Sequence, residues 1–125
     1  MSRIVADRFV SDLQYIDADV PGYYDLTARL GFESARANMI LWAEPGFRTN
    51  FVTGRKLFVV RKIVQDKMNA AAVIHDVAYT YGAQSREMAD AVFRDAMLAS
   101  GVASWRAWAA WAAVRLVGGR FYKGE

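Results

Sequence analysis

The sequence contains no cysteine, two prolines, a single histidine and no long hydrophobic run that is free of charge. The lack of cysteine excludes a disulfide scaffold and any thiolate metal site. The longest apolar stretch, SWRAWAAWAAVRLVGG, carries two arginines and is shorter than the ~20 residues that cross a bilayer. The amino terminus, MSRIVADRFVSDLQ, is interrupted by charges, which argues against a signal peptide. These absences predict a soluble protein that is made in the cytoplasm.

The composition is that of one globular domain covering residues 1–125. Hydrophobic residues make up 54% and charged residues 23% of the chain, which excludes a disordered protein. The formal net charge is only +3, and no run of lysine and arginine alternates with aromatic residues, so we expect no nucleic acid partner. A basic cluster is expected to form a solvated face or to meet phospholipid headgroups or an acidic partner; it comprises Arg55, Lys56, Arg61, Lys62 and Lys67.

The two halves of the chain differ in composition and in the spacing of their apolar residues. Residues 1–54 hold both prolines and three β-type runs, LQYID, YYDLTARLGFE and NMILWAE, with a β-turn expected at Pro21-Gly22. Residues 55–119 contain no proline and repeat apolar residues at helical spacing, and residues 120–125 form a tail. The pattern predicts an α+β fold in which a small antiparallel N-terminal sheet, or hairpins, packs with a three-helix C-terminal half.

Glycines and serines mark the ends of the three predicted helices. The first runs from Lys56 or Ile63 to Tyr81, before Gly82. Ser85 is expected to cap the second helix, which ends at Gly101. The third is expected to begin after Ser104 and to stop at residues 118–119, which are both glycine. The connections between these helices are short, so we expect neighbouring helices to pack antiparallel or at a sharp angle.

Aromatic residues are abundant for a chain of this length. There are four tryptophans, seven phenylalanines and six tyrosines, more than three short helices are expected to bury. Trp105, Trp108 and Trp111 recur every third residue on the third helix. Such a stripe is typical of a core or a subunit interface, and the alternative is a membrane-contacting face. We therefore predict that the chain belongs to an oligomeric assembly, through this stripe and through the residues 120–122 at the carboxy terminus.

The only histidine lies in the segment AAVIHDVAYTYG, which is followed by SREMADAVFRDAML. His75 and Tyr79 share one helical face, and Asp76 points about a quarter-turn away. Asp90 is surrounded by apolar residues, and because an unpaired buried carboxylate is costly, we expect it to bind His75. One interpretation is a polar pair that ties two helices together. The other is catalytic, since a carboxylate on one ring nitrogen leaves the second nitrogen as a base.

A histidine-aspartate-x-x-tyrosine segment that is followed by an aspartate on the next helix resembles the core of secretory and parvoviral phospholipase A₂ enzymes. The resemblance implies that His75 is the base, that Asp76 binds calcium, that Asp90 orients His75 and that Tyr79 supports the pair. It covers only the two segments quoted above. The Y-x-G-x-G calcium loop and the cysteines of the secreted enzymes are missing from the chain.

A longer resemblance extends almost from end to end. The segments EPGFRTNFVTG, AAVIHDVAYTYG, SREMADAVFRDAM and AAVRLVGGRFY are similar, in order and spacing, to a family of tailed-phage and prophage proteins catalogued as a domain of unknown function. The family pattern has an aspartate where this chain has Asn50, and its following Ser-x-Pro is replaced by residues 53–55. If this loop holds a cation, Asn50 keeps an oxygen ligand but loses the charge.

These resemblances lead to two hypotheses about function. The first is a virion-associated structural protein of a phage, in the tail, tail tip or baseplate, with other phage structural proteins as partners and His75–Asp90 retained for structure. The second is a calcium-dependent phospholipase-like or cell-envelope hydrolase. In that hypothesis His75, Asp90 and Tyr79 form the catalytic site, Asp76 and Asn50 hold calcium, and membrane or lipid headgroups are contacted.

Overall fold

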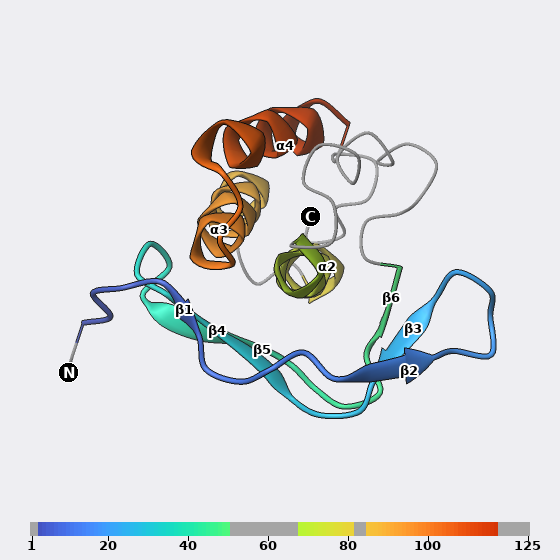
Figure 1. Ribbon diagram of the computed structural model, residues 1–125. Coiled ribbons are helices and arrows are strands. Elements are labelled where there is room, and N and C mark those ends of the chain that lie inside the picture. Colours follow the sequence, from blue (N-terminus) through green and yellow to red (C-terminus); the bar gives the residue numbers. More distant parts are fainter. Residues whose placement is uncertain (1–2, 51–67, 82–84, 118–125) are drawn as a thin grey trace.

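The computed structural model describes residues 3–50, 68–81 and 85–117, and within them the predicted α+β fold is confirmed. Among these residues, six short strands lie in the N-terminal half and three helices in the C-terminal half (Figure 1). The strands are β1 (Arg8–Phe9), β2 (Tyr15–Asp17), β3 (Tyr24–Leu26), β4 (Leu30–Ser34), β5 (Met39–Ala43) and β6 (Arg48–Thr49). The helices are α2 (Asn69–Tyr81), α3 (Arg86–Ala99) and α4 (Ser104–Val117).

The strands form two antiparallel sheets of three strands each. One has the order β1-β4-β5, with Phe32 opposite Leu41, and the other has the order β2-β3-β6. The predicted turn at Pro21-Gly22 is confirmed, because the Tyr23 amide donates to the Val20 carbonyl and Gly22 has φ of 83°. A β-turn with proline at its second position and a positive φ at its third position is typical of type II.

The sequence prediction of one continuous strand over residues 23–33 is wrong. This run is divided into β3 and β4, which belong to different sheets. Pairing partners decide the division, since β3 lies between β2 and β6 whereas β4 lies between β1 and β5. A glycine is needed in β4, because a Cβ atom on Gly31 would lie 2.5 Å from the Trp42 ring and 2.6 Å from a Val10 methyl group.

Local signals set the ends of α3. The Ser85 hydroxyl accepts a hydrogen bond from the Met88 amide, which confirms the predicted N-cap. At the other end Gly101 has φ of 88°, and the amides of Gly101 and Val102 donate to the carbonyls of Leu98 and Met97. This is the Schellman arrangement, which satisfies carbonyls that the helix leaves unpaired.

The other predicted helix ends agree only in part. Ser104 is the first residue of α4 rather than the residue before it. The described part of the first helix begins at Asn69. Several predicted features lie outside the described residues. They are the helix starts at Lys56 or Ile63, the helix ends at Gly82 and residues 118–119, the basic cluster at residues 55–67 and the carboxy-terminal patch at residues 120–122.

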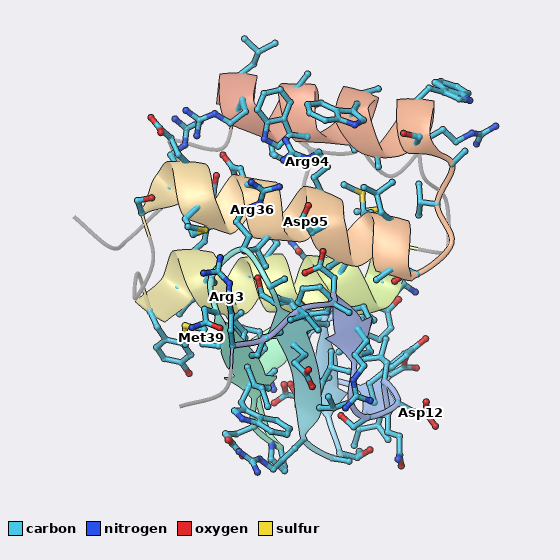
Figure 2. The ribbon with its side chains drawn as sticks, turned by 90° about the vertical axis from the view of Figure 1, so that its left-hand side faces the viewer. Arg3, Asp12, Arg36, Met39, Arg94 and Asp95 are labelled. Atoms are coloured by element: carbon cyan, nitrogen blue, oxygen red, sulfur yellow. The ribbon has the colours of Figure 1, made fainter. Side chains whose placement is uncertain are left out.

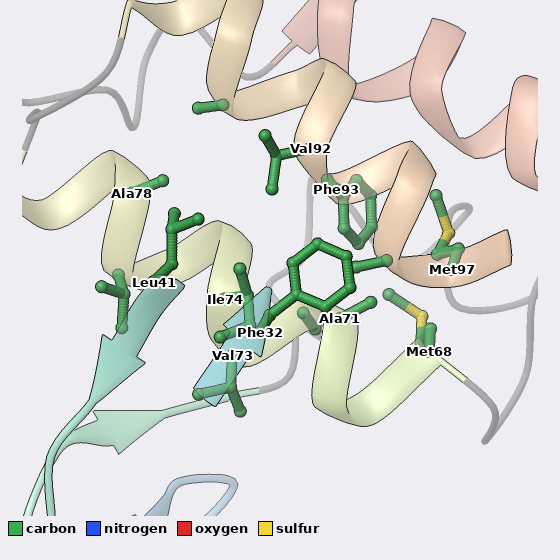
Figure 3. Close-up of a cluster of buried hydrophobic side chains, with 14 of the residues drawn as sticks. Phe32, Leu41, Met68, Ala71, Val73, Ile74, Ala78, Val92, Phe93 and Met97 are labelled. Carbon is green, nitrogen blue, oxygen red and sulfur yellow. The ribbon is translucent and has the colours of Figure 1, made fainter. Parts of the chain in front are cut away.

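The helices stack in layers above the sheets. In Figure 2, α4 lies furthest from the sheets, α3 lies beneath it and α2 is next to the strands. The core forms where α2 and α3 meet the β1-β4-β5 sheet, and Phe32 from β4 projects between Ile74 of α2 and Phe93 of α3 (Figure 3). An ion pair of 2.8 Å between Arg36 and Asp95 also ties the β4–β5 turn to α3.

The tryptophans of α4 do not form one stripe. Trp105 and Trp108 are exposed, whereas Trp111 is half-buried. The reason is helical geometry, because a step of three residues falls about 60° short of a full turn, so residues at that spacing drift around the helix. The expectation that some tryptophans stay uncovered within the chain is therefore confirmed. None of the helices among the described residues has the length and apolar character needed to cross a membrane.

Candidate functional site

The candidate site is built around the Asp90 carboxylate, which is fully buried on α3. His75 Nε2 lies 2.8 Å from Asp90 Oδ1, and the Tyr79 hydroxyl donates to the same oxygen at 2.5 Å. Arg115 Nη1, from α4, donates to Asp90 Oδ2 at 2.9 Å. The predicted contact between His75 and Asp90 is thus confirmed, and one carboxylate joins all three helices.

The spacing of α2 explains how His75 and Tyr79 reach the same oxygen. Residues four apart lie one above the other on a helix, and their rings are 4.2 Å apart at the centroids. The other side of the His75 ring stacks on Phe93 of α3 at 4.5 Å. With only 3% of its side chain exposed, the imidazole is held in one orientation by packing as well as by hydrogen bonding.

The charge state of Asp90 follows from its partners. Burial by itself would raise the pKa of Asp90, but the hydrogen bonds from His75 and Tyr79, followed by that from Arg115, lower the pKa below its ordinary value. The carboxylate is therefore ionised and can only accept, so His75 Nε2 carries the hydrogen in this contact and Nδ1 is the remaining nitrogen. The pKa of Tyr79 is raised, first by burial and then by Asp90, so its hydroxyl stays protonated.

Asp76 points away from this cluster, as its position on α2 predicts. Its Oδ2 accepts a hydrogen bond of 2.5 Å from the Thr49 hydroxyl of β6. Asp76 is partly buried, and burial raises the pKa of its carboxyl although Thr49 and His75 oppose the shift. The end of β6 and α2 therefore meet at Asp76, and Asn50 is the residue that follows Thr49.

The structure adds three residues that the sequence patterns do not reveal. Arg115 binds Asp90, and Thr49 binds Asp76. Arg86 Nη2 donates to the carbonyls of Val114 and Arg115 at 3.3 and 2.5 Å, in the last turn of α4. The S-R-x-x-A-D segment therefore has three linked roles, in which Ser85 caps α3, Arg86 binds the end of α4 and Asp90 binds His75. The sequence signal for Arg115 is that it is one of two arginines in an otherwise largely apolar helix.

The described side chains contain no acidic cluster of the kind that holds calcium. Calcium takes six to eight oxygen ligands, of which the predicted ligands Asp76 and Asn50 supply only a part. No three His, Cys, Asp or Glu side chains gather around a common point within residues 3–50, 68–81 and 85–117. Of the two predicted calcium ligands, Asp76 accepts a hydrogen bond from Thr49, the residue before Asn50, and Asp76 is the one that carries a negative charge.

Taken together, the fold and site define an α+β domain with a buried histidine-aspartate pair that is held by three helices. A family model described as a protein of unknown function (DUF1353) matches residues 24–114, from β3 into α4. The chain belongs to this family, as its resemblance to a domain of unknown function predicts. No curated protein and no solved structure was found to match it.

We expect Asp90→Asn to lower the free energy of unfolding by about 1–3 kcal/mol at pH 7. The asparagine amide cannot accept hydrogen bonds at both positions, so the His75 imidazole or the Arg115 guanidinium loses its acceptor. The folded-state pKa of Asp90 is lowered, so its contribution is present above the ordinary carboxyl pKa of 3.8 and is lost as the pH falls through the folded-state pKa. Urea unfolding of both proteins at a series of pH values measures this. An equal difference in stability at neutral and strongly acidic pH would contradict the assignment.

Asp76→Asn should have the opposite effect at neutral pH. The folded-state pKa of Asp76 is raised above 3.8, so the carboxylate destabilises the fold as the pH rises through and above 3.8. We expect the variant to melt about 4 °C higher at pH 7, corresponding to about 1 kcal/mol, and to lose this advantage at pH values below 3.8. Asp25→Asn is the control, because Arg48 lowers the pKa of Asp25 and its removal should not stabilise.

The same melting experiment tests calcium. We expect millimolar calcium to leave the melting temperature of the unsubstituted protein unchanged, because Asp76 is the one charged ligand of the predicted Asp76–Asn50 pair. A rise that disappears in Asp76→Asn would instead show a folded-state calcium site at Asp76, since a ligand well above its dissociation constant must stabilise.

Proposed function

We propose that the chain is a hydrolase in which His75 acts as a general base on a water molecule that attacks an ester carbonyl. The observation that supports this most is the hydrogen bond of 2.8 Å between His75 Nε2 and the ionised Asp90. It fixes the tautomer that leaves Nδ1 able to accept a proton, which is the arrangement a histidine base requires. Packing on Phe93 and near-complete burial keep this base out of bulk solvent.

The reaction needs only water and the ester. As the water oxygen bonds to the carbonyl carbon, its proton passes to His75 Nδ1, and the resulting imidazolium is stabilised by the Asp90 carboxylate. Collapse of the tetrahedral intermediate then breaks the bond to the leaving alkoxide, which takes the proton from Nδ1. Asp90 stays ionised throughout because its pKa is lowered, and Arg115 and Tyr79 hold it in position. No step involves calcium.

The substrate class rests on resemblance. The pairing of His75 with Asp90, and of Tyr79 with the same carboxylate, has the residue order of the phospholipase A₂ segment. An ester of a phospholipid is therefore the first substrate to test, and esters or amides of the cell envelope are the next.

We further propose that the protein is associated with the virion of a phage, as a tail, tail-tip or baseplate component. The support is the resemblance of the segments quoted in the sequence analysis to tailed-phage proteins, together with the exposed Trp105 and Trp108, which suit a protein that works against another surface. Its partners in this proposal are other phage structural proteins. The two proposals are compatible, since a particle can carry a hydrolase that acts during entry.

To test the hydrolase, phosphatidylglycerol and a short-chain p-nitrophenyl ester should be supplied to the purified full chain, with calcium and with chelator. We expect hydrolysis that persists in chelator and that falls by about 10²-fold or more in His75→Asn, because the base is removed. Asp90→Asn should also lower kcat. The matched control is Asp95→Asn, which removes another buried α3 carboxylate that is bound to an arginine, Arg36, and should retain activity. Equal activity of His75→Asn and the unsubstituted chain would refute the proposal.

For the virion association, particles released by a host strain that carries the gene should be purified on a density gradient and examined by mass spectrometry. We expect the chain to co-purify with the tail proteins at a fixed ratio. Its recovery only from the soluble host fraction would contradict this part of the proposal.

A further inference from the structure

An apolar groove of about 270 Å³ lies between β5 and the carboxy-terminal half of α2. Residues 39–42 of β5 form one wall, and Val77, Ala78 and Tyr81 of α2 form the other. We call it the β5–α2 groove. Met39 and Tyr81 are 38% and 69% exposed, and Figure 2 shows Met39 at the side of the sheet, below α2. None of the side chains in the two walls carries a charge.

The main chain of β5 presents hydrogen-bonding groups to this groove. The Val10 amide donates to the Gly31 carbonyl at 3.0 Å, and the Gly31 amide donates to the Ser11 hydroxyl at 3.0 Å, so both main-chain groups of Gly31 point away from β5. Trp42 lies opposite Gly31 in the β4–β5 register, and two opposite residues that do not bond each other both point their main-chain groups outward. The N–H and C=O groups of Trp42, and those of Ile40 two residues earlier, therefore point away from β4.

This edge of β5 lacks the features that usually protect a strand edge. Soluble proteins keep strand edges from pairing with other chains by means of charged side chains, proline or bulges. The strand has the sequence MILWA, without charge or proline, and its register with β4 runs without interruption from Met39 to Ala43. Within residues 3–50, 68–81 and 85–117, β4 is the one strand that pairs with β5. The groove therefore offers main-chain donors and acceptors beside an apolar wall.

We propose that the β5–α2 groove binds an extended, uncharged segment of a partner protein, which pairs with Ile40 and Trp42 as an additional strand of the β1-β4-β5 sheet. In this mode of recognition an edge strand supplies the hydrogen bonds, and alternate side chains of the segment enter pockets. The side chains that face the helix side lie against Leu41 and the α2 wall, so they are apolar. Because neither wall is charged, a charged side chain would lose its hydration there without gaining a partner.

The position of α2 favours a single segment over the β5 strand of a second copy. Two copies that paired antiparallel through β5 about a two-fold axis would each place an α2 helix on the same face of the joined sheet. The end of α2 already lies over this edge, since Val77, Ala78 and Tyr81 line the groove beside β5. The second α2 would need the same space, whereas an isolated extended segment leaves it to one helix.

This inference goes beyond the proposed hydrolysis and the proposed virion association, and it depends on neither. It involves β5 and the side of α2 that carries Ala78 and Tyr81, whereas His75 and Tyr79 face Asp90. Segment binding and hydrolysis can therefore fail separately, and His75→Asn should bind a peptide like the unsubstituted chain.

The first measurement is amide hydrogen exchange of the isolated full chain, resolved by residue with NMR. We expect the amides of Ile40 and Trp42 to exchange quickly, because they point into the groove. The amide of Leu41 is the internal control and should exchange slowly, because Leu41 lies opposite Phe32 at a bonded position of the β4–β5 ladder. Slow exchange at all three amides would show that the edge is already covered, and would overturn the inference.

The second measurement uses a display library of random linear peptides, selected on the purified full chain. We expect the enriched peptides to share apolar residues at alternate positions, and a synthetic peptide of enriched sequence to slow the exchange of the Ile40 and Trp42 amides. Ile40→Pro removes an outward N–H that Ile40→Ala keeps, so it should bind this peptide about tenfold more weakly than Ile40→Ala. Proline is tolerated where the N–H of an edge strand faces outward, and equal melting temperatures of the two variants check the fold.

Tyr81→Asp is the variant that decides if Ile40→Pro does not fold. Tyr81 is exposed, and the substitution places a charge in the groove, so the peptide should again bind about tenfold more weakly. Leu116→Asp is its matched control, because Leu116 is an exposed apolar residue of α4, and its replacement should leave peptide binding unchanged.

Several outcomes would overturn the inference. These are a selection that enriches no peptide, equal binding by folded Ile40→Pro and Ile40→Ala, or equal binding by Tyr81→Asp and Leu116→Asp. Dimers in light scattering that Ile40→Pro abolishes, without any enriched peptide, would assign the edge of β5 to a second copy instead.

Discussion

The arrangement of the helices depends on one buried carboxylate. Asp90 has no exposed surface, and its burial is tolerated because it accepts hydrogen bonds from His75, Tyr79 and Arg115. Two of these donors come from α2 and the third from α4, so the ionised group on α3 fixes both neighbouring helices. A hydrophobic contact would hold the helices as well, but it would not set the rotation of the His75 ring.

The two aspartates near His75 are in contrasting environments. Asp90 has several donors, including a guanidinium, and its pKa is lowered. Asp76, the residue next to His75 in the chain, has the hydroxyl of Thr49 as a partner, and its pKa is raised by burial. A carboxylate that is held at a cost in stability is typical of functional sites, where neighbouring groups are arranged for chemistry. Asp90 therefore serves the fold and orients His75, whereas Asp76 contributes no comparable support to the fold.

Helix α4 connects the candidate site with the outside of the molecule. Arg86 binds carbonyls in its last turn and Arg115 reaches inward to Asp90, so its carboxy-terminal end is anchored to α3 by two arginines. Its other side presents Trp105, Trp108 and Leu116 to the surroundings. A helix with apolar residues on all sides would normally be buried on all sides, and here one side is open.

The sequence by itself determined the features that depend on near neighbours. The turn at Pro21-Gly22, the Ser85 cap and the end of α3 at Gly101 follow from local backbone chemistry, and the His75–Asp90 contact follows from two adjacent helices. Only the tertiary structure decided the division of residues 23–33 between two sheets and the partners of Arg115 and Thr49. These depend on which distant segments meet, and the local sequence does not encode this, because a strand or a charged side chain is equally compatible with many partners until the whole chain has packed.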